Sequence, residues 1–247
     1  MTTILKDEPL LTASLVMIFM LLLFGGFIAL IIFLVIHARK KAEEARRQAQ
    51  LWAAARGWQH YARDDNLRHR WRMPLFQAGS GRRTHNVLTG PTNSKSGVVR
   101  QALSFEYEYT VSTGKSSTTY YHHVVAVFLP NYIPTLTIAP EGVGAKLAKM
   151  FGGQDIQFES EEFNRRWRIT GNNLAFAHAV VHPQTMEYLM RYAPHNVAYY
   201  LLGDALLIYT SGRQNLANID QMVWHITDLI DLVPEFVWHD YQLRPYR

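Results

Sequence analysis

The stretch "GGQDIQFESEEFNRRWRIT" at residues 152–170 looks more like chemistry than any other part of the chain beyond residue 36. It crowds carboxylates, an amide and guanidinium groups together: Asp155, Glu159, Glu161, Glu162, Asn164, Arg165, Arg166 and Arg168. Paired carboxylates act as general acid and base when they face each other across a cleft, and arginines bind anions. The stretch is therefore either an active site or a charged surface.

Side-chain alternation favours the charged surface. It predicts two strands, residues 156–160 and 163–170, each with apolar side chains on one face and charged ones on the other. Glu159 would then lie opposite Arg166 or Arg168, in a solvated pair that contributes only tenths of a kcal/mol. We interpret the stretch as the outside of a β-hairpin, with anion binding by the arginines as a minor alternative.

Histidines offer a second possible chemistry, metal binding. His178 and His182 have the i,i+4 spacing of a zinc protease helix, but Ala179 stands where the catalytic glutamate would be. Glu187 is a candidate third ligand, although Pro183 is expected to bend the helix between them. His122 and His123 are neighbours in a predicted strand and point to opposite faces. We interpret these histidines as packed or surface residues and predict no metal site.

The sequence contains none of the common motifs for nucleotide binding or serine hydrolysis. There is no G-x-x-x-x-G-K-[ST] and no G-x-S-x-G, and "GVGAK" at residues 142–146 lacks the third glycine of a dinucleotide site. With no cysteine, the chain offers no thiol chemistry, no disulfide and no site for palmitoyl, prenyl or lipoprotein attachment. A Ser/His/Asp triad stays open, because its members can come from anywhere in the chain. We therefore predict no catalytic residue and no cofactor.

The element that must position everything else is an apolar run over residues 10–36, which contains no charged residue. At about 1.5 Å per residue it spans roughly 40 Å, more than the hydrocarbon core of about 30 Å. A cleaved signal peptide would be shorter and would end at a small-residue cleavage site, and a buried core helix would keep a polar stripe. The sequence predicts a retained transmembrane helix after a short tail of residues 1–9.

Charge predicts the orientation of this helix. Residues 37–83 hold 12 Lys/Arg and 4 Asp/Glu, a net +8, whereas residues 84–247 carry a net −2. The positive-inside rule therefore places the N-terminus outside and residues 58–247 in the cytoplasm of a single-pass cell-membrane protein. Attraction of the basic flank to anionic lipid explains the excess more simply than nucleic-acid binding, which we exclude.

Residues 37–57 continue as a helix of strong helix formers that ends at Gly57. Ala38, Ala42, Ala45, Ala49 and Trp52 fall at alternating spacings of four and three, which makes a narrow heptad-like seam. Inside the membrane, Gly25 and Ala29 form a small-xxx-small pair. Both features allow self-association or contact with a protein partner.

Beyond residue 57 the pattern predicts one α+β domain with a mainly antiparallel sheet and about three helices. Strands are expected over residues 98–112, 116–130 and 135–141, and a hairpin over 196–212 that turns at Gly203-Asp204. Helices are expected over residues 144–153, over 175–193 with a proline interruption, and over 215–234, where the apolar residues share one face.

Several motifs together resemble a family of actinobacterial single-pass membrane proteins of unknown function. They are "GGQDIQFESEEFNRRWRI", "NVLTG" at residues 86–90, "HPQTMEYLM" at 182–190 and "VPEFVW" at 233–238. The resemblance covers residues 58–238 and implies a membrane anchor followed by a soluble domain. It implies no reaction, cofactor or catalytic residue.

These observations predict a membrane-anchored binding or scaffold module at the cytoplasmic face, whose ligand the sequence does not identify. Aromatic strands offer a binding surface through Tyr107, Tyr109, Tyr120 and Tyr121, at least half of which we expect in the core. The alternatives are an accessory subunit of a larger membrane complex and a membrane-bound enzyme with a deep polar pocket.

Overall fold

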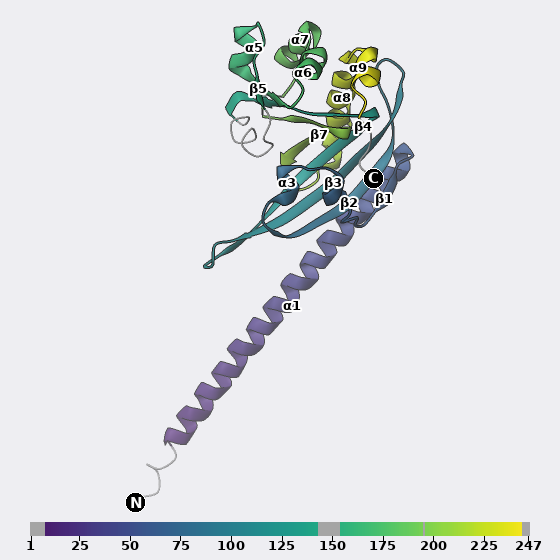
Figure 1. The fold of residues 1–247 in the computed structure, drawn as a ribbon. Coiled ribbons are helices and arrows are strands. Elements are labelled where there is room, and N and C mark those ends of the chain that lie inside the picture. The colour runs from purple at the N-terminus through teal and green to yellow at the C-terminus, as the bar shows by residue number, and fades with distance from the viewer. Residues whose placement is uncertain (1–7, 143–153, 195, 244–247) are drawn as a thin grey trace, which may run out of the picture. The chain divides into compact units, whose positions relative to one another are not determined.

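The computed structural model describes residues 8–142, 154–194 and 196–243, and the chain divides into two compact units, Met1–Gln48 and Ala49–Arg247 (Figure 1). Helix α1, Glu8–Arg56, is continuous from the apolar run through the basic segment, as predicted. It ends at Gly57, whose φ of +67° breaks the helix. The helix expected over residues 144–153 lies outside the described residues.

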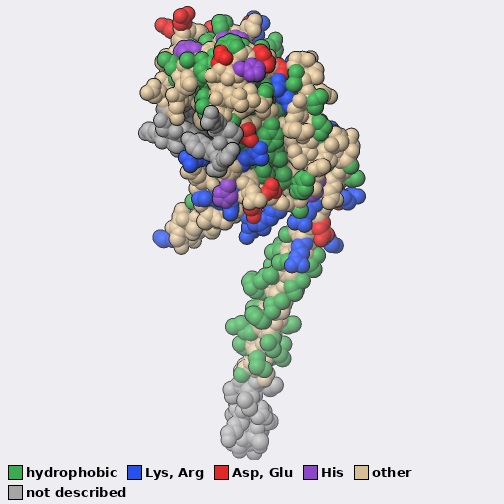
Figure 2. Space-filling model, turned by 45° about the vertical axis from the view of Figure 1, so that its right-hand side comes forward, with side chains coloured by type: hydrophobic (Ala, Val, Ile, Leu, Met, Phe, Trp, Pro, Cys, Tyr) green, Lys and Arg blue, Asp and Glu red, His purple; other side chains and the backbone are tan. Residues whose placement is uncertain are grey.

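Within the described residues, α1 is the helix long and apolar enough to cross a membrane. Its large apolar side chains between residues 15 and 36 are exposed along the whole helix, and Lys and Arg follow them (Figure 2). A soluble protein would bury such a surface, and the chain is therefore membrane-associated.

The second unit is an α+β fold built on an antiparallel sheet, as predicted. Its described strands are β1 Gln59–Tyr61, β2 Ser80–Asn93, β3 Val99–Ser112, β4 Ser117–Pro140, β5 Gln154–Ile156, β6 Trp167–Gly171 and β7 Tyr199–Ser211. They pair in the order β1-β2-β3-β4-β6-β5, with β7 also on β4. Because β3 and β7 both pair with residues 122–127 of β4, they occupy its opposite edges. β6 and β7 likewise both pair with residues 136–138 of β4, so β6 lies on the same edge of β4 as β3.

The strand predictions for residues 135–141 and 196–212 are wrong. The separate strand expected over residues 135–141 is mostly the end of β4, which runs on through residues 128–136 by register shifts. The hairpin expected over residues 196–212 is the single strand β7. Gly203, with φ +63°, makes a bulge there and not a turn, and the ring of Tyr132 covers it.

The bulge matters because β7 packs on both faces of the sheet. Tyr199 and Leu201 belong to one core before the bulge, and Leu206 and Ile208 belong to the same core after it. Odd and even positions therefore exchange faces at Gly203. The extra residues at this irregularity lie on β4, where residues 128–136 face only residues 201–205 of β7. Without the exchange at Gly203, the second half of β7 would turn its side chains to the wrong face.

Helices cover the two faces unequally. The core on one face includes residues of α6 Leu174–Val180, α7 Pro183–Arg191, α8 Leu216–Leu232 and α9 Glu235–Asp240 (Figure 1). The core on the other face lies under two short helices, α2 Leu67–Arg70 and α3 Pro74–Gln77. The proline interruption expected over residues 175–193 separates α6 from α7, and the amphipathic helix expected over 215–234 is α8.

The last turns of α1 are part of the second unit. Ala49 and Ala53 are buried in its core, and Trp52 packs against that core. The final members of the heptad-like seam therefore have partners within the fold. Trp58 follows, with its ring against Gly90 and its Nε1 donating to the Pro91 carbonyl at 3.0 Å.

We expect Gly90→Ala to destabilise the fold by about 1–3 kcal/mol, because the added Cβ would overpack this contact. It would lie 2.4 Å from the Trp58 ring and 2.9 Å from the Trp58 Cα, which is backbone. Urea unfolding of the full-length chain in detergent, followed by near-UV circular dichroism, measures the loss. Gly142→Ala, where a Cβ meets open space, is the matched control. Equal midpoints for the two variants would contradict the packing argument.

Candidate functional site

Residues 154–171 form a strand, a helix and a strand. β5 and β6 pair in antiparallel fashion, but the strand predicted over residues 163–170 begins only at Trp167, because residues 163–166 belong to helix α5, Glu161–Arg166. Ser160 caps this helix by accepting from the Phe163 amide at 3.2 Å, with acids in the first turn and arginines in the last. The cap and the dipole-matched charges outweigh the alternation that predicted a strand.

Its carboxylates do not converge on a cleft. Arg168 pairs with Asp155 at 2.7 Å and with Glu141 at 3.2 Å, and Glu159, the predicted partner, is exposed. Asn164 instead holds the loop before α5, bonding both the amide and the carbonyl of Phe158. The stretch is a charged surface, as interpreted, although its pairing differs from the prediction.

The i,i+4 histidines lie in separate surroundings. His178, on α6, packs at a tilt of 57° against Phe158, with ring centroids 4.6 Å apart. His182 precedes Pro183 at the start of α7, and its Nε2 lies 2.8 Å from the Leu232 carbonyl oxygen, to which it donates. In the described ranges, no group of three or more His, Cys, Asp or Glu is placed to hold a metal ion.

The adjacent histidines point to opposite faces of β4. His122 stacks parallel to Tyr109, 5.6 Å away, and its edge meets Tyr209. Tyr109 stacks in turn on Tyr120, which is 45% exposed, whereas Tyr107 is fully buried. The predicted aromatic surface is therefore divided between core and solvent.

His123 belongs to a buried polar network on the other face. Its Nε2 lies 2.9 Å from Ser104 Oγ, which also accepts from Gln214 Nε2 at 2.9 Å. Glu106 accepts from Arg213 at 2.8 Å and from the Gln214 amide at 3.0 Å. The network joins β3 and β4 to the segment that leads into α8.

A serine beside a histidine raises the question of a catalytic triad. The Asn215 amide faces His123 Nδ1 at 3.5 Å, so Nδ1 accepts and the proton sits on Nε2. A histidine in this tautomer donates to Ser104 and cannot take its proton. Burial also lowers the pKa of His123 to about 4. This pair is a structural bridge and not an activated nucleophile.

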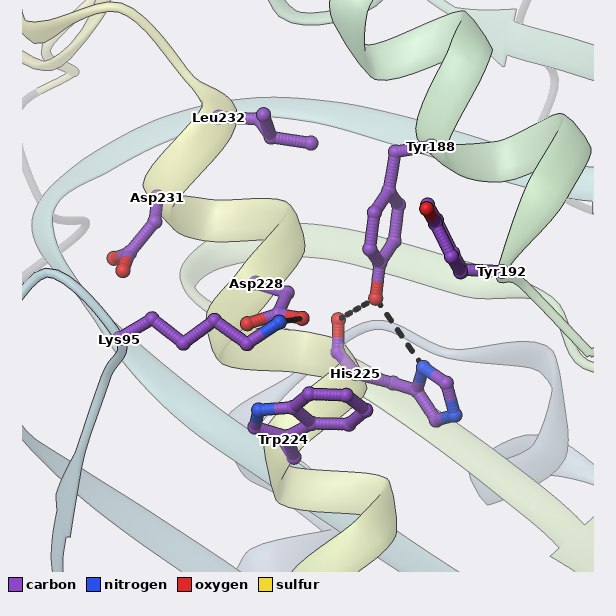
Figure 3. A pocket seen from close by; sticks show the side chains of 8 residues that line it. All are labelled: Lys95, Tyr188, Tyr192, Trp224, His225, Asp228, Asp231 and Leu232. Carbon is purple, nitrogen blue, oxygen red and sulfur yellow. Dashed lines mark hydrogen bonds and ion pairs between the residues drawn. The ribbon is translucent and has the colours of Figure 1, made fainter.

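A cavity of about 460 Å³ lies between α7, α8 and the β2–β3 turn at residues 94–98 (Figure 3). It is lined by Lys95, Tyr188, Tyr192, Trp224, His225, Asp228, Asp231 and Leu232. Tyr188 lies on α7 and Tyr192 is the residue that caps its C-terminus, while Trp224, His225, Asp228, Asp231 and Leu232 lie on α8. Tyr192 is 62% exposed and Trp224 46% exposed. The cavity therefore has an aromatic mouth.

Ion pairs fasten the turn to α8. Asp228 and Asp231 lie three residues apart on one helix face. Lys95 Nζ donates to Asp228 Oδ2 at 2.6 Å and lies 4.0 Å from the centre of the Trp224 ring, a cation–π contact. Asp231 accepts from Arg100 at 3.0 Å and from the Ser96 amide at 3.3 Å. Burial raises the pKa of Asp231, but the hydrogen bonds from Arg100 and the serines outweigh it, so the net pKa is lowered.

The remaining polar pair in the cavity is Tyr188 and His225. The Tyr188 hydroxyl lies 3.2 Å from His225 Nδ1 and 3.3 Å from the His225 carbonyl oxygen. Burial raises the pKa of Tyr188 well above its usual range and lowers that of His225. Both side chains are therefore neutral near pH 7, and Tyr188 is a poor proton donor. The arrangement suits recognition better than proton transfer.

Sequence reasoning did not find this site. Lys95 and Asp228 are 133 positions apart, and nothing in either segment signals the other. One signal was present: Trp224 interrupts the polar face of an otherwise amphipathic helix, four residues before Asp228. An exposed tryptophan beside a carboxylate on a helix marks a candidate binding surface.

The fold and the site define a class: a membrane-associated α+β protein whose helix-covered antiparallel sheet carries a cavity with an aromatic mouth. No family model matches the chain, and no curated protein does. Among solved structures, the crystal structure of the mycobacterial trehalose monomycolate transport factor A, TtfA, is similar, with a TM-score of 0.51. The alignment covers 76% of this chain and 96% of that one at 14% sequence identity. This likeness shows a shared fold.

We expect Arg100→Met to cost about 3 kcal/mol of stability, because it strands the Asp231 carboxylate in a largely buried site. The side chains of Arg100 and Asp231 are only 10% and 15% exposed. Arg191→Met should cost about 1 kcal/mol or less, since Arg191 and its partner Glu187 are 66% and 58% exposed. Urea unfolding of both variants in detergent tests the order. A loss in Arg191→Met as large as that in Arg100→Met would contradict the burial argument.

The pKa of His123 predicts a pH dependence of stability. Because the folded value of about 4 lies below the unfolded value of about 6.5, the folded state binds the proton less well. Stability is full above pH 6.5 and falls by up to about 3 kcal/mol as the pH drops to 4. The slope of the unfolding free energy against pH, measured between pH 7.5 and 4.5, reports the number of protons taken up on unfolding. In His123→Gln this number should be smaller by about one. An unchanged slope would place the titration elsewhere.

Proposed function

We propose that this chain is a non-catalytic accessory factor, anchored at the cytoplasmic face of the cell membrane, that binds a protein partner at the α7–α8 cavity. One observation carries the proposal: the cavity combines half-exposed aromatic rings with charges that are already paired. Tryptophan, tyrosine and arginine dominate binding energy at protein interfaces. Trp224 and Tyr192 stand at the mouth, where a partner's side chain would reach them.

The anchor and its charge support the location. The exposed apolar surface of α1 requires a lipid environment, and the Lys and Arg that follow residue 36 favour the cytoplasmic side. The same flank attracts anionic lipid headgroups. Anchoring confines the folded unit to the membrane surface and raises its effective concentration toward membrane partners.

The fold supports an accessory role in membrane transport. The similar structure is described as a transport factor, and we propose a corresponding supporting role for this chain within a larger membrane complex. The enzyme alternative has less support, because the polar groups of the cavity are ion-paired or neutral near pH 7. The cargo of such a complex is left open by this chain's own residues.

Partner binding predicts a mass difference. Full-length protein, released gently from its own membrane, should carry a discrete protein partner in native mass spectrometry. The double variant Tyr192→Ala with Trp224→Ala should lose that mass. Tyr61→Ala is the matched control, because Tyr61 is 49% exposed on β1, away from the cavity. Retention of the partner by the double variant would show that the cavity is not part of the interface. A monomer without partner mass from the native chain would contradict a stable complex.

Topology is tested by labelling. The chain has no cysteine, so a single introduced thiol reports its own compartment. We expect Lys115→Cys, in the exposed β3–β4 turn, to react with a membrane-impermeant maleimide only after the cells are permeabilised. Thr3→Cys should react in intact cells. The reverse pattern would invert the proposed orientation.

A further inference from the structure

A second hollow, of about 410 Å³, lies on the opposite face of the sheet from the α7–α8 cavity, around α2, α3 and the start of β2. Its lining is rich in donors over an aromatic floor: Arg68, His69, Trp71, Arg72, Phe76, Gln77 and Arg82. No carboxylate belongs to this lining. Arginine side chains are donor-only and stay charged at all physiological pH values. The hollow therefore concentrates positive charge.

Nearby acids are already occupied by other arginines. Asp65 pairs with Arg63 and also accepts from the Thr84 amide at 3.0 Å. Asp204 accepts from Arg70 at 2.7 Å and from Trp71 Nε1 at 2.8 Å. Among the ion pairs of the described residues, none includes Arg68, Arg72 or Arg82. These three arginines therefore have no carboxylate in direct contact, although Arg68 also helps to lower the pKa of Asp65 at longer range.

Two of the guanidinium groups are held in place by uncharged partners. Arg82 donates through Nε to the Ala78 carbonyl at 3.0 Å and through Nη2 to the carbonyls of Gln77 and Gly79. Arg68 donates through Nη1 to the Arg82 carbonyl at 3.0 Å. Backbone carbonyls fix the geometry of these groups but leave their full charge. This is preorganisation for an anion, since little side-chain entropy is lost on binding.

His69 adds a further donor. Its Nε2 accepts from Arg68 Nε at 2.9 Å, so the proton of the neutral ring sits on Nδ1. Arg72 is exposed and extends the cationic wall toward solvent. Planar guanidinium groups match the oxygens of a phosphoryl group, which accepts several charge-assisted hydrogen bonds at once.

We propose that this hollow binds a phosphoryl group, carried either by a soluble phosphorylated ligand or by an anionic lipid headgroup. The site is independent of the α7–α8 cavity and of the partner proposed for it. Arg68 and Arg82 supply guanidinium groups that are already held in position, and the exposed guanidinium group of Arg72 donates to the phosphoryl oxygens from the solvent side.

Inorganic pyrophosphate is the first probe. Full-length protein in nanodiscs of phosphatidylcholine should bind it with one-to-one stoichiometry in isothermal titration calorimetry. Arg72→Gln should weaken binding at least tenfold, and Arg72→Lys should restore part of it. Arg191→Gln is the charge-matched control, because Arg191 is an exposed arginine on α7 paired with Glu187. Equal affinities for Arg72→Gln and Arg191→Gln, or no binding by the native chain with no lipid retention either, would overturn the proposal.

A second arm separates the two sources of the phosphoryl group. Native mass spectra of the full-length chain in neutral detergent are compared with added phosphatidylglycerol or phosphatidylcholine. Because the basic flank of α1 also attracts anionic lipid, the measured quantity is the difference between Arg72→Gln and Arg191→Gln. Loss of a phosphatidylglycerol adduct only in Arg72→Gln identifies a lipid headgroup. Pyrophosphate binding with no such difference identifies a soluble ligand. Unchanged melting temperatures exclude misfolding, which is not expected at an exposed side chain.

Discussion

Strand β4 is the constraint on which the rest of the fold depends, because both of its edges must be paired. Backbone donors and acceptors in the interior need partners, and this strand of 24 residues runs through the middle of the sheet. β7 pairs with one edge, and β3 followed by β6 pairs with the other. Alternate side chains then enter two cores, Val125 and Val127 on one face and Val124 and Ala126 on the other. Both candidate binding sites are built on this single ladder.

The two faces carry different chemistry on a common backbone. On the α7–α8 face, two aspartates meet two basic side chains, so the cavity is close to neutral and its aromatic rings dominate. On the α2–α3 face, the arginines of the hollow meet neutral carbonyls, and charge dominates. The proposed functions of the two sites both rest on this difference: aromatic contact with a protein partner on one face, and charge-assisted binding of a phosphoryl group on the other.

Local signals in the sequence predicted the elements that one segment determines by itself. The apolar run, the strong helix formers and Gly57 predict α1, and apolar periodicity predicts α8. Prediction failed at residues 196–212, where pairing with a distant strand determines the local structure. Gly203-Asp204 reads as a turn, yet β4 holds that segment as one strand and the glycine becomes a bulge. α5 was missed because charged alternation hid the cap at Ser160. Neither cavity was predicted. The lining of the α7–α8 cavity joins Lys95 to residues 188–232, whereas residues 68–82 alone line the other hollow, and their basic charge was interpreted as attraction to lipid.

The ion pair that holds the turn at residues 94–98 depends on the dielectric constant of its surroundings. Its link from Lys95 to Asp228 joins an exposed ammonium to a carboxylate that is only 6% exposed, so water and salt screen one end. Any molecule seated over Trp224 displaces that water, and the attraction between two charges grows as the surrounding dielectric constant falls. Occupying the cavity would therefore tighten its own rim. The strength of this ion pair therefore depends on which molecule covers it.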